Sequence, residues 1–221
     1  MDFAGKVAIV TGAGRGIGRA VALALGRNGC QLAVAARSAS ELVSLADEVQ
    51  KLGQQAIAVT TDVTEESAVS VLVDRTRAVF GRIDILVNAA NGYQHSAFAD
   101  CSTETWHELV AVNLTGPFLC TRAVVPIMKE QSYGKVIHVA DGCVSSPAGE
   151  ATAYTSVKSG LIGMTRSLAV ELRGDGIQVN AICPNDRKMD IEDVAMTALF
   201  LAGSGADKIT GAVIDVSGRA G

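Results

Sequence analysis

The chain has 221 residues, of which 48% are hydrophobic and 19% charged, and its net charge at neutral pH is −4. This length and composition predict one compact domain over residues 1–221 and argue against a disordered, collagenous or coiled-coil protein. The small acidic excess offers no electrostatic basis for binding nucleic acid or an anionic membrane, so we expect a small-molecule substrate as the partner.

Short apolar runs rich in β-formers alternate with longer segments of helical periodicity. The predicted strands are 7–10, 32–35, 56–60, 83–87, 135–139, 177–182 and 212–216. The predicted helices are 17–27, 42–52, 68–80, 106–128, 154–172 and 191–201. Strands and helices that alternate with short connections form right-handed βαβ units. We therefore expect an α/β, Rossmann-like doubly wound parallel sheet of about seven strands, which binds ligands at the carboxyl ends of its strands.

The first predicted strand runs directly into a turn with four glycines. Residues 11–18 read T-G-A-G-R-G-I-G, and the first predicted helix follows. Glycine permits positive φ and lets a phosphate approach closely, while the helix N-terminus stabilises the anion. This turn is expected to bind the pyrophosphate of a dinucleotide. Its candidate residues are Gly12, Gly14, Arg15, Gly16, Ile17 and Gly18.

Charge at the end of the second predicted strand indicates which dinucleotide binds. NAD-dependent sites place an acidic residue there for the ribose 2′-hydroxyl, whereas a 2′-phosphate needs cations. Here Ala36 occupies that position, Arg37 follows it, and Arg15 lies in the glycine turn. Two charge-assisted hydrogen bonds of about 1.5–3 kcal/mol each favour NADP(H) by a hundredfold or more, so NAD(H) is the less favoured cofactor. Just beyond, Ser38 and Glu41 have capping-box spacing for the second helix.

The glycine turn resembles the T-G-x-x-x-G-x-G motif of the short-chain dehydrogenase/reductase family, and the resemblance extends over nearly the whole chain. Asp62 and Val63 resemble the adenine-contacting pair of the family, and in its N-N-A-G segment only Asn88 and Ala90 match. Asn113 resembles the asparagine that interrupts a central helix of the family. The resemblance implies that Asp62, Val63, Asn88 and Ala90 bind the cofactor and that Asn113 supports a proton relay.

Tyr154 and Lys158 resemble the catalytic Y-x-x-x-K pair of the family. Four residues apart on a helix, the two side chains share a face, and a nearby ammonium favours the ionised form of a phenol. In the family, the tyrosine exchanges a proton with the substrate. The lysine lowers the pKa of the tyrosine and binds the nicotinamide ribose, while hydride passes between the nicotinamide and the substrate carbon.

Asp141 departs from the family, which carries a serine at this place to polarise the substrate oxygen. A carboxylate about 4 Å from Tyr154 would oppose Lys158 by roughly 4 kcal/mol at an effective dielectric of 20. Asp141 is therefore protonated and donates as serine would, or is itself the acid/base, or turns away and leaves the role to Cys143 or Ser145. It could also merely cap a turn. We expect the protonated form in reduction, because desolvation beside a nicotinamide disfavours a charged carboxyl.

A second departure follows the sixth predicted strand, where residues 180–185 resemble the N-x-x-x-P-G segment of the family with Asn185 in place of glycine. The family then inserts a few dozen residues that form a substrate lid. Here residues 186–188 lead at once into a stretch that resembles the region beyond that lid. Either the protein lacks the lid or the sequence omits it. Without a lid, water exclusion is poor, which favours a bulky substrate or no turnover.

Three functions fit these residues. The leading one is an NADP(H)-dependent oxidoreductase that interconverts a carbonyl and a secondary alcohol. The alternatives are a non-redox isomerase, dehydratase or lyase on the same scaffold, and a catalytically impaired nucleotide-binding subunit. The resemblance also implies a homodimer or homotetramer formed through the helices at 106–128 and 154–172, the second of which is more apolar than one core-facing stripe requires.

Localisation and metal content follow from simple counts. No apolar run reaches the roughly 18–20 residues needed to cross a bilayer, and the N-terminus lacks signal-peptide order, so we expect a cytoplasmic protein. The five cysteines show no C-x-x-C spacing, which predicts buried free thiols. The three histidines have no partner at metal-ligand spacing, and we expect no metal site.

Overall fold

A computed structural model describes residues 3–185 and 190–217, and its centre is one parallel sheet. The strands follow the order β3-β2-β1-β4-β5-β6-β7, and every neighbouring pair is parallel. They are β1 (Val7–Thr11), β2 (Gln31–Ala36), β3 (Ala56–Thr60), β4 (Ile85–Asn88), β5 (Gly134–Val139), β6 (Ile177–Pro184) and β7 (Val213–Val216). This arrangement confirms the predicted Rossmann-like doubly wound sheet.

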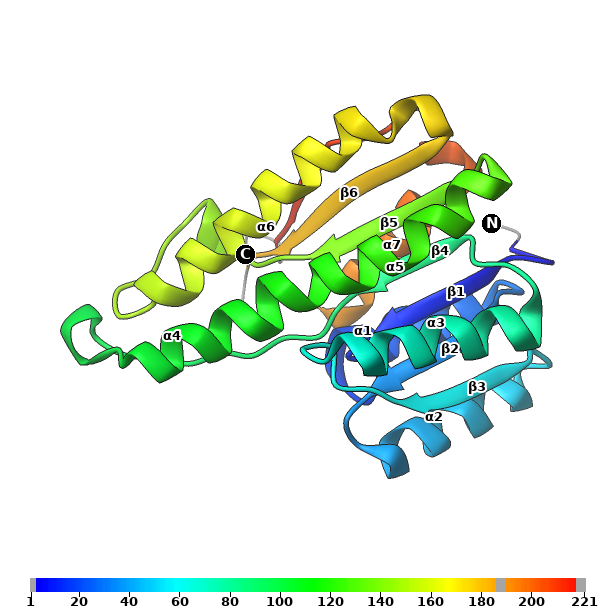
Figure 1. Ribbon diagram of the computed structural model, residues 1–221, viewed down its shortest axis with the longest axis horizontal. Coiled ribbons are helices and arrows are strands. Elements are labelled where there is room, and N and C mark those ends of the chain that lie inside the picture. Colours follow the sequence, from blue (N-terminus) through cyan, green and yellow to red (C-terminus); the bar gives the residue numbers. More distant parts are fainter. Residues whose placement is uncertain (1–2, 186–189, 218–221) are drawn as a thin grey trace.

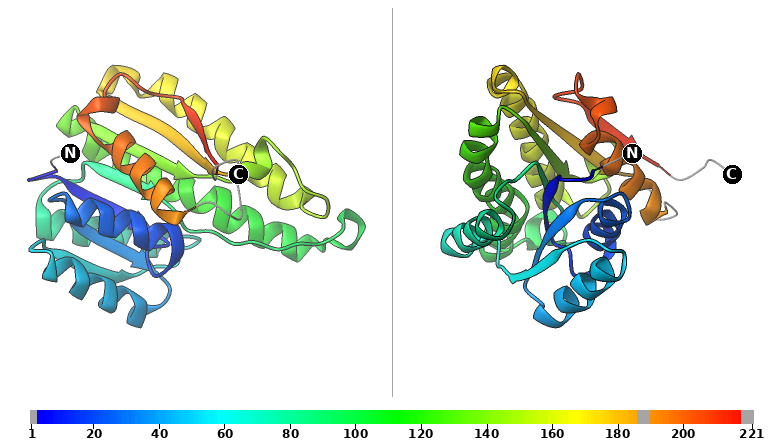
Figure 2. Two further views of the ribbon diagram at one scale, coloured as in Figure 1. Left: turned by 180° about the vertical axis from the view of Figure 1, so that it is seen from behind. Right: turned by 90° about the vertical axis from the view of Figure 1, so that its right-hand side faces the viewer.

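Helices cover both faces of the sheet. The face seen in Figure 1 carries α3 (Glu66–Phe80), α5 (Gly116–Gln131) and α6 (Thr152–Glu171). The opposite face, seen from behind in Figure 2, carries α1 (Gly16–Arg27), α2 (Ala39–Lys51) and α7 (Ile191–Ala202). Helix α4 (Thr103–Val110) continues the line of α5 and extends past the carboxyl ends of the strands, beside the start of α6.

The sheet separates two apolar layers, which explains why the strands read as unbroken hydrophobic runs. In β1, Ala8 and Val10 pack in the layer with α1 and α2, whereas Ile9 packs in the layer with α3 and α5. All five residues of β1 are buried. Fully burying a valine or isoleucine side chain contributes about 1.5–3 kcal/mol, so both layers stabilise the central strands.

The strand order reverses between β1 and β4, which pair directly through Thr11 and Asn88. The helices that follow these two strands leave in opposite directions, to opposite faces of the sheet. A crevice therefore opens at the carboxyl ends of the strands, where open α/β sheets bind their ligands.

The helical stretch Thr103–Gln131 differs from one sequence expectation. By length and composition alone it could cross a membrane, although no single apolar run suggested a span. Its most apolar 18-residue window is 44% buried, and α5 contacts both β4 and β5. The core helix of a packed layer passes the same test.

The cysteines are all free thiols, but burial differs among them. Cys30, Cys120 and Cys183 are buried, as predicted, whereas Cys101 and Cys143 are partly exposed. The expectation of five buried thiols was therefore wrong for two of them. Both lie in connections beyond the strand ends, where packing is less complete.

Candidate active site

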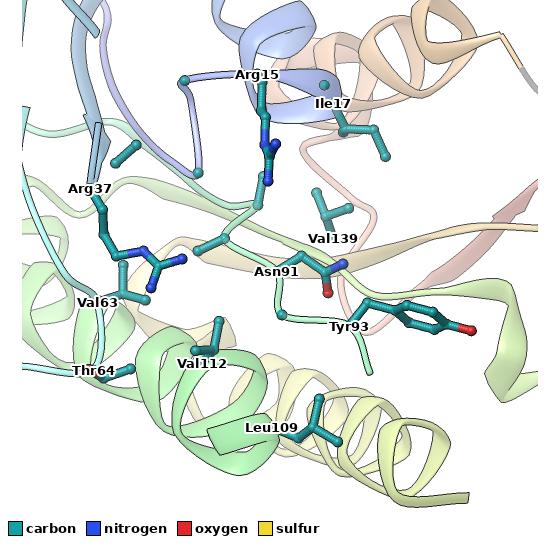
Figure 3. A pocket seen from close by; sticks show the side chains of 18 of the residues that line it. Arg15, Ile17, Arg37, Val63, Thr64, Asn91, Tyr93, Leu109, Val112 and Val139 are labelled. Atoms are coloured by element: carbon teal, nitrogen blue, oxygen red, sulfur yellow. The ribbon is translucent and has the colours of Figure 1, made fainter. Parts of the chain in front are cut away.

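A cleft of about 930 Å³ runs along the carboxyl ends of the central strands and collects most of the predicted site residues. Those that line it are Gly12, Gly14, Arg15, Gly16, Ile17, Gly18, Arg37, Asp62, Val63, Ala90, Asp141, Tyr154 and Lys158. Asn88 and Asn113 lie behind the wall instead. Figure 3 shows side chains from the glycine turn, β2 and the segment after β4 pointing into the cavity.

The glycine turn forms one end of the cleft from backbone alone. Gly12 has a φ of 63° and Gly16 a φ of 57°, a region that glycine enters without strain. A Cβ at Gly12 would meet the Ala89 carbonyl, and a Cβ at Gly18 would meet the backbone of Gly12. Helix α1 begins at Gly16 with no acidic residue in its first turn. Its unpaired N–H groups therefore lie at the cleft with no competing carboxylate on that turn.

Two arginines point into this end from different sides (Figure 3). Arg15 comes from the glycine turn and Arg37 from the end of β2, and neither makes an ion pair within the described part of the chain. Glu41 lines the same end, and a Cβ at Gly14 would meet its side chain. Ser38 is the N-cap residue of α2 but makes no side-chain cap bond. The predicted capping box is therefore not formed, and Glu41 is an acidic group of the cleft.

The Asp62 carboxylate is hydrogen-bonded within its own turn. Its Oδ1 accepts hydrogen bonds from the Thr64 N–H at 3.0 Å and the Thr64 hydroxyl at 2.8 Å. These donors, the backbone N–H first, hold the pKa of the Asp62 carboxyl below its usual value. The turn presents Val63 to the cleft, where Figure 3 shows it near Arg37.

Asn113 lies in a π-helical turn, Ala111–Thr115, between α4 and α5. Such turns are frequent at functional sites. The Asn113 amide nitrogen donates to the carbonyls of Gly92, at 2.8 Å, and Leu109, at 3.0 Å, and its oxygen accepts the Gly92 N–H at 3.3 Å. Asn113 thus clamps the segment after β4 instead of entering the cleft, and this segment carries Asn91 and Tyr93.

Asn88 also faces away from the cleft. Its amide donates to the Thr121 hydroxyl at 3.2 Å, within a buried chain that continues through His138 to Thr165. Burial, and then Lys158, lower the pKa of His138 to about 3, so its ring is neutral. Asn88 therefore joins β4 to α5 and β5, and its side chain is not part of the cavity wall.

Tyr154 lies at the inner end of the cleft and is only 2% exposed. Its hydroxyl lies 3.1 Å from Asp141 Oδ2 and 3.1 Å from Asn91 Oδ1. The ring of Tyr93 meets the Tyr154 ring edge-on, with centroids 4.9 Å apart. Asn91 and Tyr93 were absent from the sequence-based candidates. The signal for Asn91 was that it replaces the glycine of the N-N-A-G segment.

Asp141 points toward Tyr154, so the arrangement in which it turns away is wrong. Its second oxygen, Oδ1, accepts the Cys143 N–H at 2.8 Å, and Asp141 therefore also caps a turn. Ser145 is engaged elsewhere, with its hydroxyl 3.2 Å from Asp215. In this state both Asp141 oxygens are within hydrogen-bond distance of a donor, which suits a carboxylate.

Lys158 is buried beside the tyrosine, with 1% exposure. Its ammonium donates to the Val139 carbonyl at 3.2 Å and lies 5.6 Å from the centroid of the Tyr154 ring. Within residues 3–185 and 190–217 it makes no other hydrogen bond, so two of its three N–H donors are free for a ligand in the cleft.

The electrostatics of the pair differ from the family expectation. Burial raises the pKa of Tyr154 above its usual value, and the charge of Asp141 raises it further. Burial lowers the pKa of Lys158 to about 8, although Asp141 works in the opposite direction. In this state of the site, burial and the Asp141 carboxylate dominate the pKa of Tyr154, and the lowering of that pKa by Lys158 stays a prediction.

These residues fit a nicotinamide dinucleotide. The glycine cradle would be filled by any Cβ at Gly12 or Gly18, an open helix N-terminus adjoins it, and cations stand at one end. A buried lysine with free donors stands at the other end, as ribose hydroxyls require.

Known proteins resemble the chain over nearly its whole length. A family profile described as short chain dehydrogenase matches residues 6–196. The (2S)-[(R)-hydroxy(phenyl)methyl]succinyl-CoA dehydrogenase subunit BbsD of Thauera aromatica is 33% identical over 99% of this chain and 97% of its own. A 3-oxoacyl-[acyl-carrier-protein] reductase of Synechocystis is 36% identical over 96% of both chains. A solved short-chain alcohol dehydrogenase structure from Sinorhizobium meliloti 1021 has a TM-score of 0.94, is 31% identical, and matches 98% of this chain and 96% of its own.

The expected lid region lies largely outside the described residues. Strand β6 ends at Pro184 and α7 begins at Ile191, and residues 186–189 fall in the gap. The alignment with the Thauera protein runs over 242 positions, whereas this chain has 221 residues, so the alignment leaves gaps in this chain.

Proposed function

Because the chain belongs to the short-chain dehydrogenase family of nicotinamide-dependent oxidoreductases, we propose that it interconverts a carbonyl and a secondary alcohol with NADP(H). One observation carries the proposal. A single cleft joins a glycine cradle and two arginines, which make no ion pair with any residue that the structure describes, to a tyrosine hydroxyl, a carboxylate and a buried lysine at the other end. This arrangement binds an elongated anionic cofactor beside a group that can transfer a proton.

The cofactor is held by residues along the whole cleft. The turn at Gly12–Gly18 and the N-terminus of α1 bind the pyrophosphate, Asp62 and Val63 border the adenine, and Lys158 binds the nicotinamide ribose. When bound, the cofactor supplies or accepts a hydride at the substrate carbon.

The protein supplies the proton. In reduction, the Tyr154 hydroxyl gives its proton to the substrate oxygen, and in oxidation it takes that proton back. Asp141 lies within hydrogen-bond distance of the same hydroxyl and stands where the family serine polarises the substrate oxygen. Its hydrogen-bond pattern suits a carboxylate in the nucleotide-free protein. The protonated form expected during reduction concerns the nucleotide-bound state and stays a prediction.

The preference for NADP(H) rests on charge. Ala36 leaves no carboxylate at the end of β2, while Arg15 and Arg37 point into the cavity without ion pairs in the described part of the chain. Glu41 at the same end opposes a 2′-phosphate, so the net preference is the balance of two cations against one anion. Two arginines outweigh one carboxylate because the guanidinium fork also forms directed hydrogen bonds.

Absorbance at 340 nm tests the activity directly. The purified protein is mixed with NADPH, or separately with NADH, and with acetoacetyl-CoA or a panel of simple ketones. We expect loss of NADPH with the carbonyl compound present and slower loss of NADH. Product formation without nucleotide turnover would support a non-redox enzyme instead, a reading that the Asp141–Tyr154 contact also permits. Nucleotide binding with no product from any compound would support an impaired subunit.

We also propose a homodimer or homotetramer. Helices α5 and α6 lie side by side on one face of the sheet (Figure 1). Their outer surfaces expose Phe118 at 45% and Val170 at 75%. Light scattering at micromolar concentration should give a mass of two or four chains of 22.8 kDa. A mass of one chain would refute this.

A further inference from the structure

Asn91 is an unassigned residue at the centre of the candidate active site. It follows β4 and replaces the glycine of the family segment, and its side chain reaches the Tyr154 hydroxyl. Figure 3 shows it projecting into the cavity between Val139 and Tyr93. The clamp of Asn113 on Gly92 fixes the backbone immediately beside it, so this side chain starts from a held position.

The contacts around the tyrosine hydroxyl pose a problem of hydrogen count. The hydroxyl has one proton and two acceptor lone pairs. Two oxygens, Asp141 Oδ2 and Asn91 Oδ1, each lie 3.1 Å from it. With Asp141 ionised, the single tyrosine proton cannot make two good hydrogen bonds, so one of these pairs would bring two oxygens together with no hydrogen between them.

A half-turn of the Asn91 amide resolves the problem. It exchanges the positions of Oδ1 and Nδ2, which have nearly the same shape. Tyr154 then accepts an N–H from Asn91 and donates its O–H to Asp141, and each of the two contacts contains a hydrogen. The Asn91 side chain makes no other hydrogen bond within the described residues, so no existing contact opposes the half-turn.

Asp141 is the better acceptor of the tyrosine proton. A carboxylate accepts more strongly than an amide oxygen. Its other oxygen already accepts the Cys143 N–H at 2.8 Å, a contact that suits the charged form. In the alternative arrangement, a protonated Asp141 donates to the Tyr154 oxygen and Asn91 accepts the tyrosine proton. The Cys143 N–H would then donate to a neutral carboxylic acid, which is a weaker acceptor than a carboxylate.

We propose that Asn91 is a positioning residue whose side-chain amide donates a hydrogen bond to the Tyr154 oxygen, so that in the site without nucleotide and substrate the tyrosine proton points toward Asp141. The role of Tyr154 in this inference rests on the proposed function, but the direction of the hydrogen bond does not. In reduction, the tyrosine O–H bond breaks and its proton forms the O–H of the product alcohol. The Asn91 N–H then stabilises the charge left on the tyrosine oxygen. The hydrogen bond of Asn91 lowers the pKa of Tyr154, whereas Asp141 raises it.

Folding stability distinguishes a donor from an acceptor without any substrate. Asn91→Ala removes the amide, and Asn91→Asp keeps its shape but replaces N–H with carboxylate oxygens. The ionisable groups facing this site are Asp141, Cys143, Lys158 and Tyr93, besides Tyr154 itself. If Asn91 donates, Asn91→Asp places a second carboxylate against the hydroxyl next to Asp141. We then expect its urea midpoint at pH 8 to lie below that of Asn91→Ala.

The difference should shrink toward pH 5, because protonation of one carboxyl removes the repulsion and restores a donor. Gln94→Glu adds the same charge to the same segment with no contact to Tyr154, and it serves as the matched control. Its midpoint relative to the wild type should not follow this pH pattern. If Asn91→Asp is as stable as Asn91→Ala at pH 8, or more stable, the amide is an acceptor and the proposal is wrong.

Kinetics provide the second arm, with acetoacetyl-CoA and NADPH as the probes. Asn91→Ala should lower kcat by about tenfold and leave the dissociation constant of NADPH unchanged, because a lost hydrogen bond to a charged group costs about this much. In the Asp141→Ser background the same change should cost less than about twofold, since the serine hydroxyl can donate to the Tyr154 oxygen in place of the Asn91 amide. Equal losses in both backgrounds would overturn the proposal. Absence of turnover in the wild type would count against the proposed function alone, and the stability arm would still decide the hydrogen bond.

Discussion

The two ends of the cleft are built in different ways. At the adenosine end, one short stretch of backbone provides the cradle, and its residues are neighbours in sequence. At the catalytic end, Asn91, Asp141 and Tyr154 come from the segment after β4, the turn after β5, and α6, and they meet at one hydroxyl. The departures from the family pattern concentrate at this second end. Asn185, which replaces a family glycine, is one of these departures, because it lies against Gly142, next to Asp141.

The contrast shows where a family site can change. A cradle built from backbone tolerates few substitutions, because any side chain at Gly12 or Gly18 would fill it. A side-chain site can exchange partners if the new set still satisfies its hydrogen bonds. An amide and a carboxylate around the tyrosine hydroxyl form such a set.

The largest expected effect tests the catalytic end. Tyr154→Phe removes the proton donor and should lower kcat by about 10²–10⁴-fold, with the dissociation constant of NADPH nearly unchanged. Lys158→Ala should lower kcat and also weaken NADPH binding, because the lysine serves both the tyrosine and the ribose. Steady-state kinetics and fluorescence titration measure the two quantities. Wild-type turnover in Tyr154→Phe would disprove the catalytic assignment.

The next effect tests the adenosine end. Arg37→Ala should weaken NADP(H) binding by about tenfold or more, because a charge-assisted hydrogen bond to the 2′-phosphate is lost. NAD(H) binding should barely change. Glu41→Gln is the matched variant with the opposite sign and should strengthen NADP(H) binding several-fold, since it removes the carboxylate at that end of the cleft. Equal or tighter binding of NAD(H) by the wild type would reject the cofactor assignment.

Variants of Asp141 test whether this residue acts protonated, as the family serine would, or is itself the acid/base. If Asp141 acts protonated in reduction, activity falls as the pH rises and the acid ionises. Asp141→Ser cannot ionise there, so it should retain activity and extend it to higher pH, while Asp141→Asn should retain part of it. The measurement is kcat against pH for the three proteins. An inactive Asp141→Asn variant that binds NADPH normally would make Asp141 the acid/base itself, and unchanged kinetics in both variants would place it outside the reaction.

The smallest expected effect is the pH dependence of NADPH binding, for which Lys158 is responsible. Its pKa is lowered to about 8, chiefly by burial, so the ammonium is charged below that pH and loses its proton above it. Anionic nucleotide binds better to the charged form. NADPH affinity should therefore fall several-fold as the pH rises from about 7 to about 9. Fluorescence titration of Lys158→Ala should show a weaker dependence over the same range, and an identical slope would exclude the lysine as its source.

Much of the fold could be predicted from local pattern. All seven strands and the helices between them lie within a few residues of their predicted positions, because unbroken apolar runs and helical periodicity record burial directly. The single helix predicted at 106–128 is instead α4 and α5, separated by a π-helical turn. Asp141 was recognised as a departure because it stands at a motif position. Glu41 was misassigned, since capping-box spacing does not reveal that Gly14 leaves space for its side chain.

The sequence alone determined the strands, the helices and the glycine cradle, because short runs of neighbouring residues create these features and burial pattern and short-range sterics govern them. Only the tertiary structure decided that Asn91 and Asp141 share the Tyr154 hydroxyl, that Asn113 and Asn88 act from behind the wall, and that burial sets the pKa values of the catalytic pair. The physical reason is distance along the chain. Hydrogen bonds between residues 13 and 63 positions apart, and the loss of water around them, exist only once the strands and helices have packed.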